Sequence, residues 1–184
     1  MTAYIARHLI LSKRSKLLTL AAALGFGLVS CSDGAERNYN VPTSLCGVSI
    51  TAASLTPVLP AGEKVSQKSV SPADGVKRCQ VSVDSKIVLV AGQEWWSDKP
   101  NLRQIAQGQA YVELEQFSDD GNYIYSGRGA VAKVKCAEPM RPENELFTVI
   151  QVPEPGRADA TAVKKIITAF TTALSSSDQC TRDS

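Results

Sequence analysis

The residues of this chain that could do chemistry are its five cysteines and one histidine, and their spacing is restrictive. The cysteines contain no CxxC pair, which argues against a zinc site. Serine and cysteine nucleophiles usually need a histidine base. The histidine, His8, lies within the first 30 residues, which are expected to be removed as a signal peptide. We therefore predict that the chain has no metal site, no cofactor and no catalytic residue.

Two pairs of carboxylates, Glu113/Glu115 and Asp119/Asp120, are the remaining candidates for acid–base chemistry. Such chemistry needs a carboxyl group in a pocket that raises its pKa. The two glutamates alternate along an expected strand, and the two aspartates precede Gly121 in an expected turn, where short polar residues favour turn geometry. Both pairs are therefore better explained by local structure than by catalysis.

The first 30 residues have the pattern of a lipoprotein signal peptide. Four basic residues and no acidic one come first: Arg7, Lys13, Arg14 and Lys16. The uncharged run Leu17–Val29 would form about 20 Å of helix, too short for a hydrocarbon core of about 30 Å. The run ends in Leu28-Val29-Ser30-Cys31, which resembles the lipobox of bacterial prolipoproteins. The alternative is a plain signal peptide followed by a chance cysteine.

The lipobox resemblance implies that Cys31 becomes the lipidated N-terminal residue. Acyl chains on Cys31, palmitate among them, would anchor the protein to the extracytoplasmic face of the cell membrane, and two chains suffice for stable anchoring. Residues 31–41 are polar and aperiodic, so we predict a flexible tether there and a globular domain over residues 42–184. Of the 20 basic residues, four precede Cys31, so the remainder carries a formal charge of −2. Nucleic acid is not an expected partner.

Four cysteines remain beyond Cys31, and an even number in an exported domain predicts two disulfides. Cys46, Cys79, Cys136 and Cys180 allow three pairings. We favour the sequential pairing, Cys46–Cys79 and Cys136–Cys180, in which the two loops do not interleave. Each bond would stabilise the fold by about 3–4 kcal/mol in the chain-entropy model.

The hydrophobic patterns predict a single α+β domain, mostly an antiparallel sheet with a short N-terminal helix and a packed C-terminal helix. The short helix is expected within Thr51–Leu59, with Thr51 as its N-cap. The C-terminal helix is expected from the N-cap Asp159 onward. Its apolar residues form one stripe: Val163, Ile166, Ile167, Phe170 and Leu174. We expect this stripe to cover the sheet, although it could instead meet a partner or a membrane surface.

The strands are expected at residues 64–70, 79–83, 87–90, 109–117, 123–136 and 146–152. Asp119-Asp120-Gly121-Asn122 is a turn signal, so the fourth and fifth of these strands are expected to form a long hairpin. In that hairpin Glu113 and Glu115 would oppose Lys133 and Lys135.

The adjacent Trp95 and Trp96 are the main candidates for a binding surface. Neighbouring strand residues point to opposite faces, so at least one indole is the more exposed. Tyr123, Tyr125 and Arg128 are expected near a sheet end, and tryptophan, tyrosine and arginine are typical of binding hot spots. The alternative is that both tryptophans pack under loops.

Five features of the chain belong together: the lipobox, the tether, Pro42-Thr43-Ser44-Leu45-Cys46-Gly47, a short helix ending at Leu59-Pro60 and four further cysteines. In combination they resemble the small secreted lipoproteins of unknown function of high-GC Gram-positive bacteria. The resemblance implies a fold and a location but no catalytic residue. We therefore expect a membrane-anchored extracytoplasmic binding module whose partner is an envelope protein or a small ligand. The alternatives are a carrier of a lipid or small apolar ligand and a carboxylate-dependent cell-envelope hydrolase.

Overall fold

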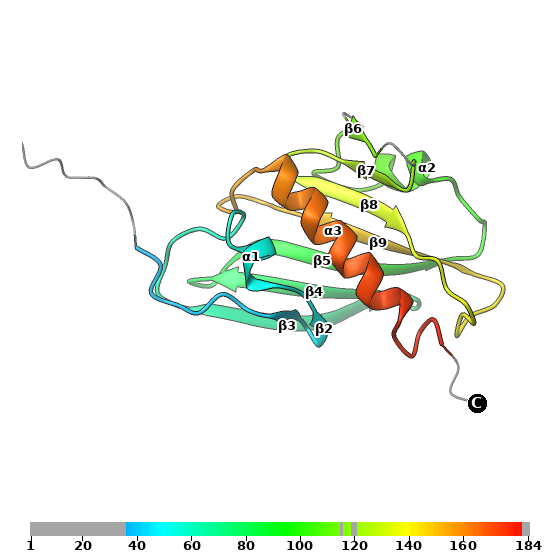
Figure 1. Cartoon of the computed structure of the whole chain (residues 1–184), viewed down its shortest axis with the longest axis horizontal. Helices are drawn as coiled ribbons and strands as arrows, with labels where there is room; N and C mark the ends of the chain where they lie inside the picture. The colour runs from blue at the N-terminus through cyan, green and yellow to red at the C-terminus, as the bar shows by residue number, and fades with distance from the viewer. Residues whose placement is uncertain (1–35, 115, 119–120, 182–184) are drawn as a thin grey trace, which may run out of the picture. The chain divides into compact units, whose positions relative to one another are not determined.

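The computed structural model describes residues 36–114, 116–118 and 121–181, and these residues are organised around a seven-stranded sheet (Figure 1). The strand order is β3-β4-β5-β9-β8-β7-β6, and every neighbouring pair is antiparallel. The strands are β3 Val65–Ala73, β4 Val76–Val83, β5 Lys86–Trp96, β6 Gln116–Phe117, β7 Tyr123–Tyr125, β8 Gly129–Lys133 and β9 Glu145–Gln151. The predicted α+β class with a mostly antiparallel sheet is confirmed.

Helix α3, Ala160–Ser175, crosses one face of the sheet over β7, β8 and β9 (Figure 1). The Asp159 side chain caps it by accepting a hydrogen bond of 2.9 Å from the Ala162 amide. The buried residues of α3 include the whole predicted stripe, so the stripe faces the sheet as expected. At the centre of this interface the hydroxyls of Thr148 and Thr171 lie 2.6 Å apart in a hydrogen bond. Within the described ranges, no helix is long and apolar enough to cross a bilayer.

The N-terminal part of the domain packs on the same face, beside α3. It comprises the two-stranded sheet of β1 Ser44–Leu45 and β2 Val48–Ser49, followed by α1 Ala52–Leu55. Thr51 caps α1 as predicted, since its hydroxyl accepts from the Ser54 amide at 3.3 Å. The bond Cys46–Cys79 ties the turn between β1 and β2 to β4. Together with Cys136–Cys180 it confirms the predicted sequential pairing.

The predicted tether at residues 31–41 is wrong for its described part, residues 36–41. The Arg37 guanidinium donates to the carbonyl oxygens of Thr56 at 2.9 Å and of Leu59 at 2.6 Å. The Tyr39 hydroxyl donates to the Pro60 carbonyl oxygen. The carbonyl oxygens of Thr56 and Leu59 follow α1 and have no donors within the helix. Arg37 satisfies both of them and thereby holds residues 36–41 against the domain. Residues 1–35, with the predicted signal peptide and Cys31, lie outside the described residues.

The opposite face of the sheet is covered in part by α2, Leu102–Gln107, which contacts β7 and β8. The sequence analysis did not predict this helix. Asn101 and Gln104 form a capping box at its start. The helix buries a second, smaller apolar cluster: Ile105, Ala106, Ile124, Val131, Phe147 and Val149.

The predicted long hairpin over residues 109–136 is wrong. Residues 109–114 are not a strand, and in the described part of 109–117 only Gln116–Phe117 joins the sheet, beside β7. The segment passes directly over Gly129, where a Cβ atom would lie 2.3 Å from the Tyr111 carbonyl oxygen. Tyr111 takes a left-handed φ of 65°, which breaks the extended run.

The second half of that hairpin is split by a turn between β7 and β8. The Ser126 hydroxyl accepts from the Gly129 amide at 3.2 Å and stabilises this turn. The register then places Lys133 opposite Phe147 of β9, and its ammonium pairs with Glu145 at 2.6 Å. The predicted pairing of Lys133 with the glutamates of residues 109–117 is therefore replaced by a pairing with β9.

Candidate functional site

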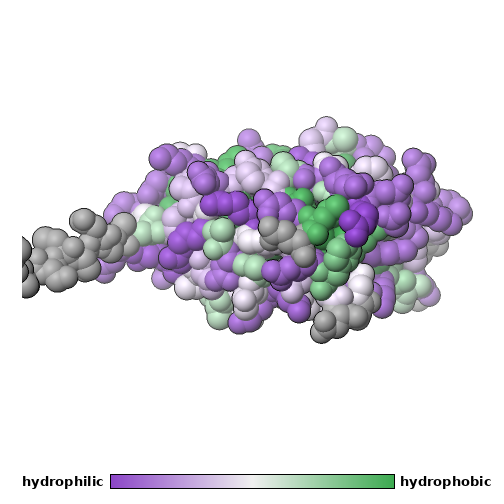
Figure 2. All heavy atoms as spheres, turned by 90° about the horizontal axis from the view of Figure 1, so that it is seen from above, coloured by the Kyte–Doolittle hydropathy of each residue, from purple (hydrophilic) through white to green (hydrophobic). Residues whose placement is uncertain are grey.

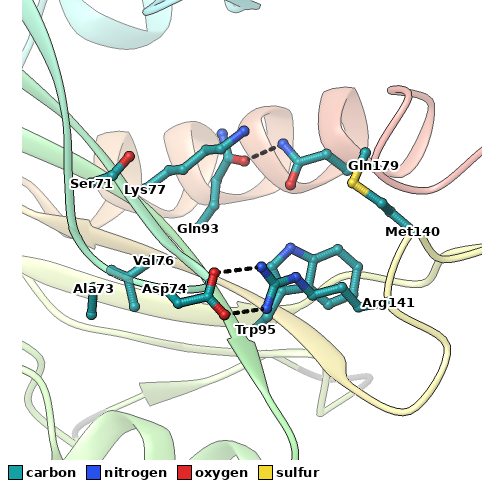
Figure 3. Close-up of a pocket in the computed structure, with 11 residues that line it drawn as sticks. Ser71, Ala73, Asp74, Val76, Lys77, Gln93, Trp95, Met140, Arg141 and Gln179 are labelled. Atoms are coloured by element: carbon teal, nitrogen blue, oxygen red, sulfur yellow. Dashed lines mark hydrogen bonds and ion pairs between the residues drawn. The ribbon is translucent and has the colours of Figure 1, made fainter.

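A pocket of about 430 Å³ lies at one end of the sheet, where the β3–β4 turn, the end of β5, the loop 137–144 and the segment after α3 meet (Figure 3). We name it the Trp95 pocket. Its lining residues are Ser71, Ala73, Asp74, Gly75, Val76, Lys77, Gln93, Trp95, Met140, Arg141 and Gln179. Its volume falls in the usual range for small-ligand sites, about 300–1,000 Å³.

Strand register brings the central side chains of the pocket to one face. Lys77 of β4 lies opposite Gln93 of β5, and Gln93 lies opposite Thr148 of β9. Thr148 contacts α3, so the three residues share the face that α3 covers. Trp95, two residues after Gln93, points the same way and is half-buried against the main core.

One wall of the pocket is made of two segments that are bound to each other. The bond Cys136–Cys180 joins the start of the loop 137–144 to the segment that follows α3. Beside it, the Glu138 amide donates to the Cys180 carbonyl oxygen and the Met140 amide donates to the Gln179 carbonyl oxygen, each at 2.9 Å. This wall therefore has a covalent link and backbone hydrogen bonds that hold it in place.

An ion pair joins that wall to the β3–β4 turn. The Arg141 guanidinium donates to both carboxylate oxygens of Asp74, at 2.9 and 2.7 Å (Figure 3). These hydrogen bonds lower the pKa of Asp74 from its ordinary value and raise that of Arg141. Both side chains are solvent-exposed, so water screens the pair and it adds little to folding stability.

The turn itself requires glycine at Gly75, whose φ is 73°. A Cβ atom there would lie 3.3 Å from the Trp95 Cβ and 3.4 Å from Nη1 of Arg141. The Gly75 carbonyl oxygen also accepts from the Trp95 amide at 2.9 Å. The close approach of the turn to Trp95 and Arg141 therefore depends on the missing side chain.

Several polar groups of the pocket are not committed to the fold. The Gln179 amide nitrogen donates to the Gln93 side-chain oxygen (Figure 3). Neither amide has another side-chain partner among the described residues. The Lys77 ammonium and the Ser71 hydroxyl likewise have no hydrogen bond or ion pair within that part of the chain. The pocket thus presents donors and acceptors to a ligand.

A second pocket, of about 290 Å³, also uses Trp95. Its lining residues are Trp95, Lys133, Val134, Lys135, Cys136, Pro139, Asn144, Glu145 and Leu146. Its carboxylate, Glu145, is engaged with Lys133. Each of the two pockets therefore holds a single carboxylate, which is paired with a cation in both cases.

Trp96 lies on the other face of β5, where the residue is 38% exposed. Its indole donates to Glu94 at 3.3 Å, and Glu94 also accepts from Gln109 at 3.0 Å and pairs with Arg78 at 3.4 Å. Glu94 is only 3% exposed, so these partners are needed to satisfy a buried carboxylate. Trp96 is thus part of this polar cluster and is separate from the Trp95 pocket.

The other three predicted binding residues also lie away from Trp95. Tyr123 and Tyr125 are on β7, partly buried beneath α3, and the Lys164 ammonium lies 5.2 Å from the Tyr125 ring centre. Arg128 donates to the carbonyl oxygens of Val152 at 3.0 Å and Gly156 at 3.1 Å, so it holds the segment that leads into α3. The structure therefore separates the five residues instead of gathering them into one patch, and their roles in binding stay predictions.

Among the pocket residues, the sequence analysis identified Trp95 but not Asp74, Lys77, Gln93, Arg141 or Gln179. Asp74-Gly75 is a readable hairpin turn between two strands, which could have located that edge. Nothing in the local pattern pairs Asp74 with Arg141, which is 67 residues away.

An exposed hydrophobic patch lies on the side of the molecule that carries β6, β7 and α2 (Figure 2). Phe117, with 45% of its surface exposed, lies on this side and packs under Arg103, whose guanidinium is 4.9 Å from the ring centre. Residues 119–120, next to Phe117 in the chain, lie outside the described residues, and we assign no site there.

Over the described ranges, no group of three histidine, cysteine or acidic side chains is placed to hold a metal ion. Comparison with known proteins finds no family model, curated protein or solved structure that matches this chain. The site must therefore be interpreted from its own geometry.

The substitution Arg141→Gln is expected to raise the pKa of the Asp74 carboxyl toward its ordinary value of 3.8, because the guanidinium that stabilises the carboxylate is lost. Side-chain carboxyl NMR through an acid titration measures this shift. Because the pKa of Asp74 is lowered in the folded protein, the ion pair stabilises the fold at pH values above the ordinary pKa of the carboxyl. This contribution is lost as the pH falls through the pKa of Asp74 in the folded protein.

Arg103→Gln, on the opposite face of the sheet, is the matched control and should leave the Asp74 titration unchanged. An Asp74 pKa that is the same with and without Arg141 would contradict the assigned ion pair.

Proposed function

We propose that this protein is a membrane-anchored extracytoplasmic binding module and that its ligand site is the Trp95 pocket. The observation that carries the proposal is Trp95 itself, a half-buried indole that lines two adjoining pockets. One wall of the pocket is formed by two segments that a disulfide and backbone hydrogen bonds hold together. A preformed concave site with an aromatic wall and a few polar groups is the usual form of a small-ligand site.

The anchor rests on the lipobox at Cys31. The two disulfides of the domain support a location outside the cytoplasm, because disulfides form and persist in oxidising compartments. Arg37 is already hydrogen-bonded to the domain, and the chain from Cys31 to Arg37 can span at most about 20 Å. On this proposal the domain stays close to the bilayer and binds ligands at the membrane surface.

Two observations favour binding over the alternatives. An apolar carrier would need a cavity between sheet and helix, but Ile166, Ile167 and Phe170 of α3 are at most 1% exposed and pack directly on the sheet. A carboxylate-dependent hydrolase would need an acidic pair in a cleft, and each pocket described above holds one carboxylate that is paired with a cation.

Cys31→Ser is expected to move the full-length protein from the membrane fraction to the soluble fraction, because the lipidated thiol is lost. Intact mass spectrometry of the unsubstituted protein should show a chain that starts at Cys31 and carries acyl groups. Recovery of an unmodified chain that starts at Met1 would contradict the anchor.

Trp95→Ala is expected to lower the amount of ligand that the detergent-solubilised protein captures from cell envelopes by about tenfold or more, because Trp95 is the aromatic side chain of the pocket lining. Mass spectrometry of the bound material measures the capture. Trp96→Ala, the neighbouring indole on the other face, is the control and should retain the ligand. Equal capture by both variants, with both shown to be folded by circular dichroism, would contradict the assigned site.

A further inference from the structure

We propose that the Trp95 pocket binds a sugar ring that carries one carboxylate, such as a uronic acid unit. This inference rests on the proposed function, which assigns ligand binding to this pocket. It is argued from three properties of the pocket: its aromatic wall, its uncommitted hydrogen-bonding groups and its charge.

The aromatic wall suits the apolar face of a sugar ring. The π-face of an indole carries partial negative charge, and the C–H groups of a pyranose face carry partial positive charge, so the two surfaces attract when stacked. Trp95 packs against the main core, which fixes the ring before the ligand arrives.

The polar groups suit hydroxyls better than an apolar ligand. A hydroxyl both donates and accepts, and the pocket offers both kinds of partner. The bond between the Gln93 and Gln179 side chains leaves the side-chain N–H groups of Gln93 and the side-chain carbonyl oxygen of Gln179 without another partner among the described residues. The Ser71 hydroxyl is also uncommitted there. An apolar occupant would strip water from these groups without replacing its hydrogen bonds, which is unfavourable.

The charge of the pocket suits one carboxylate. Asp74 neutralises Arg141, whereas the Lys77 ammonium has no ion pair within the described ranges, so the lining carries one unbalanced positive charge. Lys77 lies directly opposite Gln93 across β4 and β5, and Figure 3 shows both side chains reaching toward Gln179. A carboxylate on the ring would therefore meet Lys77 while the ring hydroxyls meet the amides.

The two tryptophans of the chain allow a site-specific measurement, because Trp96→Phe leaves Trp95 as the single indole. The full-length Trp96→Phe protein in detergent is titrated at constant ionic strength with galacturonate, its trimer, galactose, galactose 1-phosphate and acetate. We expect a saturable change in Trp95 emission with galacturonate or its trimer, binding about tenfold or more weaker with galactose, and no change with acetate. Binding of the monomer points to a free sugar, and binding of the trimer alone points to a polysaccharide.

A second variant tests the role of the charge. Lys77→Gln in the same background should weaken galacturonate binding by about tenfold or more and leave galactose binding unchanged. Lys68→Gln, an exposed lysine on the opposite face of the neighbouring strand β3, is the control and should change neither.

Four outcomes would overturn this inference: no response to any sugar, galactose binding as tightly as galacturonate, tighter binding of galactose 1-phosphate, or equal effects of Lys77→Gln and Lys68→Gln. If capture from envelopes still depends on Trp95 in such a case, the proposed ligand class, a carboxylated sugar, is wrong and the proposed binding function stands. If Trp95-dependent capture also fails, the proposed function fails with it.

Discussion

The apolar stripe of α3 packs on one face of the sheet, and the position of this packing determines where the chain continues beyond the helix. A sheet of this size must bury one face, and α3 does so together with the N-terminal segment that includes α1. The helix ends at Ser175, and the next residues reach the end of the sheet at Gln179 and Cys180. The pocket therefore lies beyond the C-terminal end of α3, at the end of the sheet that the helix does not cover.

The two disulfides act at the two ends of this cover. Cys46–Cys79 fixes the N-terminal segment to β4, and Cys136–Cys180 fixes the segment after α3 to the loop that follows β8. The loop that carries the second bond also places Arg141 beside Asp74 of the β3–β4 turn, although the two residues are 67 positions apart in the chain. A pocket assembled from such distant segments would be costly to order at the moment of binding, and cross-linking them in advance lowers that cost.

The sequence predicted the elements with strong local signals and missed the features that depend on long-range contacts. The stripe behind Asp159 was found because helical spacing is a local property. The even number of cysteines predicted two disulfides, and the favoured sequential pairing is the one observed. The alternation in residues 109–117 suggested a strand, yet the crossing of Tyr111 over Gly129 prevents one, and this contact is invisible in the pattern. The capping box of Asn101 and Gln104 was a readable signal for α2 that the neighbouring Pro100 obscured.

The bond Cys136–Cys180 holds the wall of the Trp95 pocket in place. Amide hydrogen exchange in the double variant Cys136→Ser/Cys180→Ser tests it most directly, with Cys46→Ser/Cys79→Ser as the matched control. We predict that exchange at the Glu138 and Met140 amides becomes faster by about tenfold or more, with protection retained in β4 and β5, because these two amides donate to the segment that the disulfide holds. Unchanged exchange at both amides, or the same acceleration in the control, would contradict it.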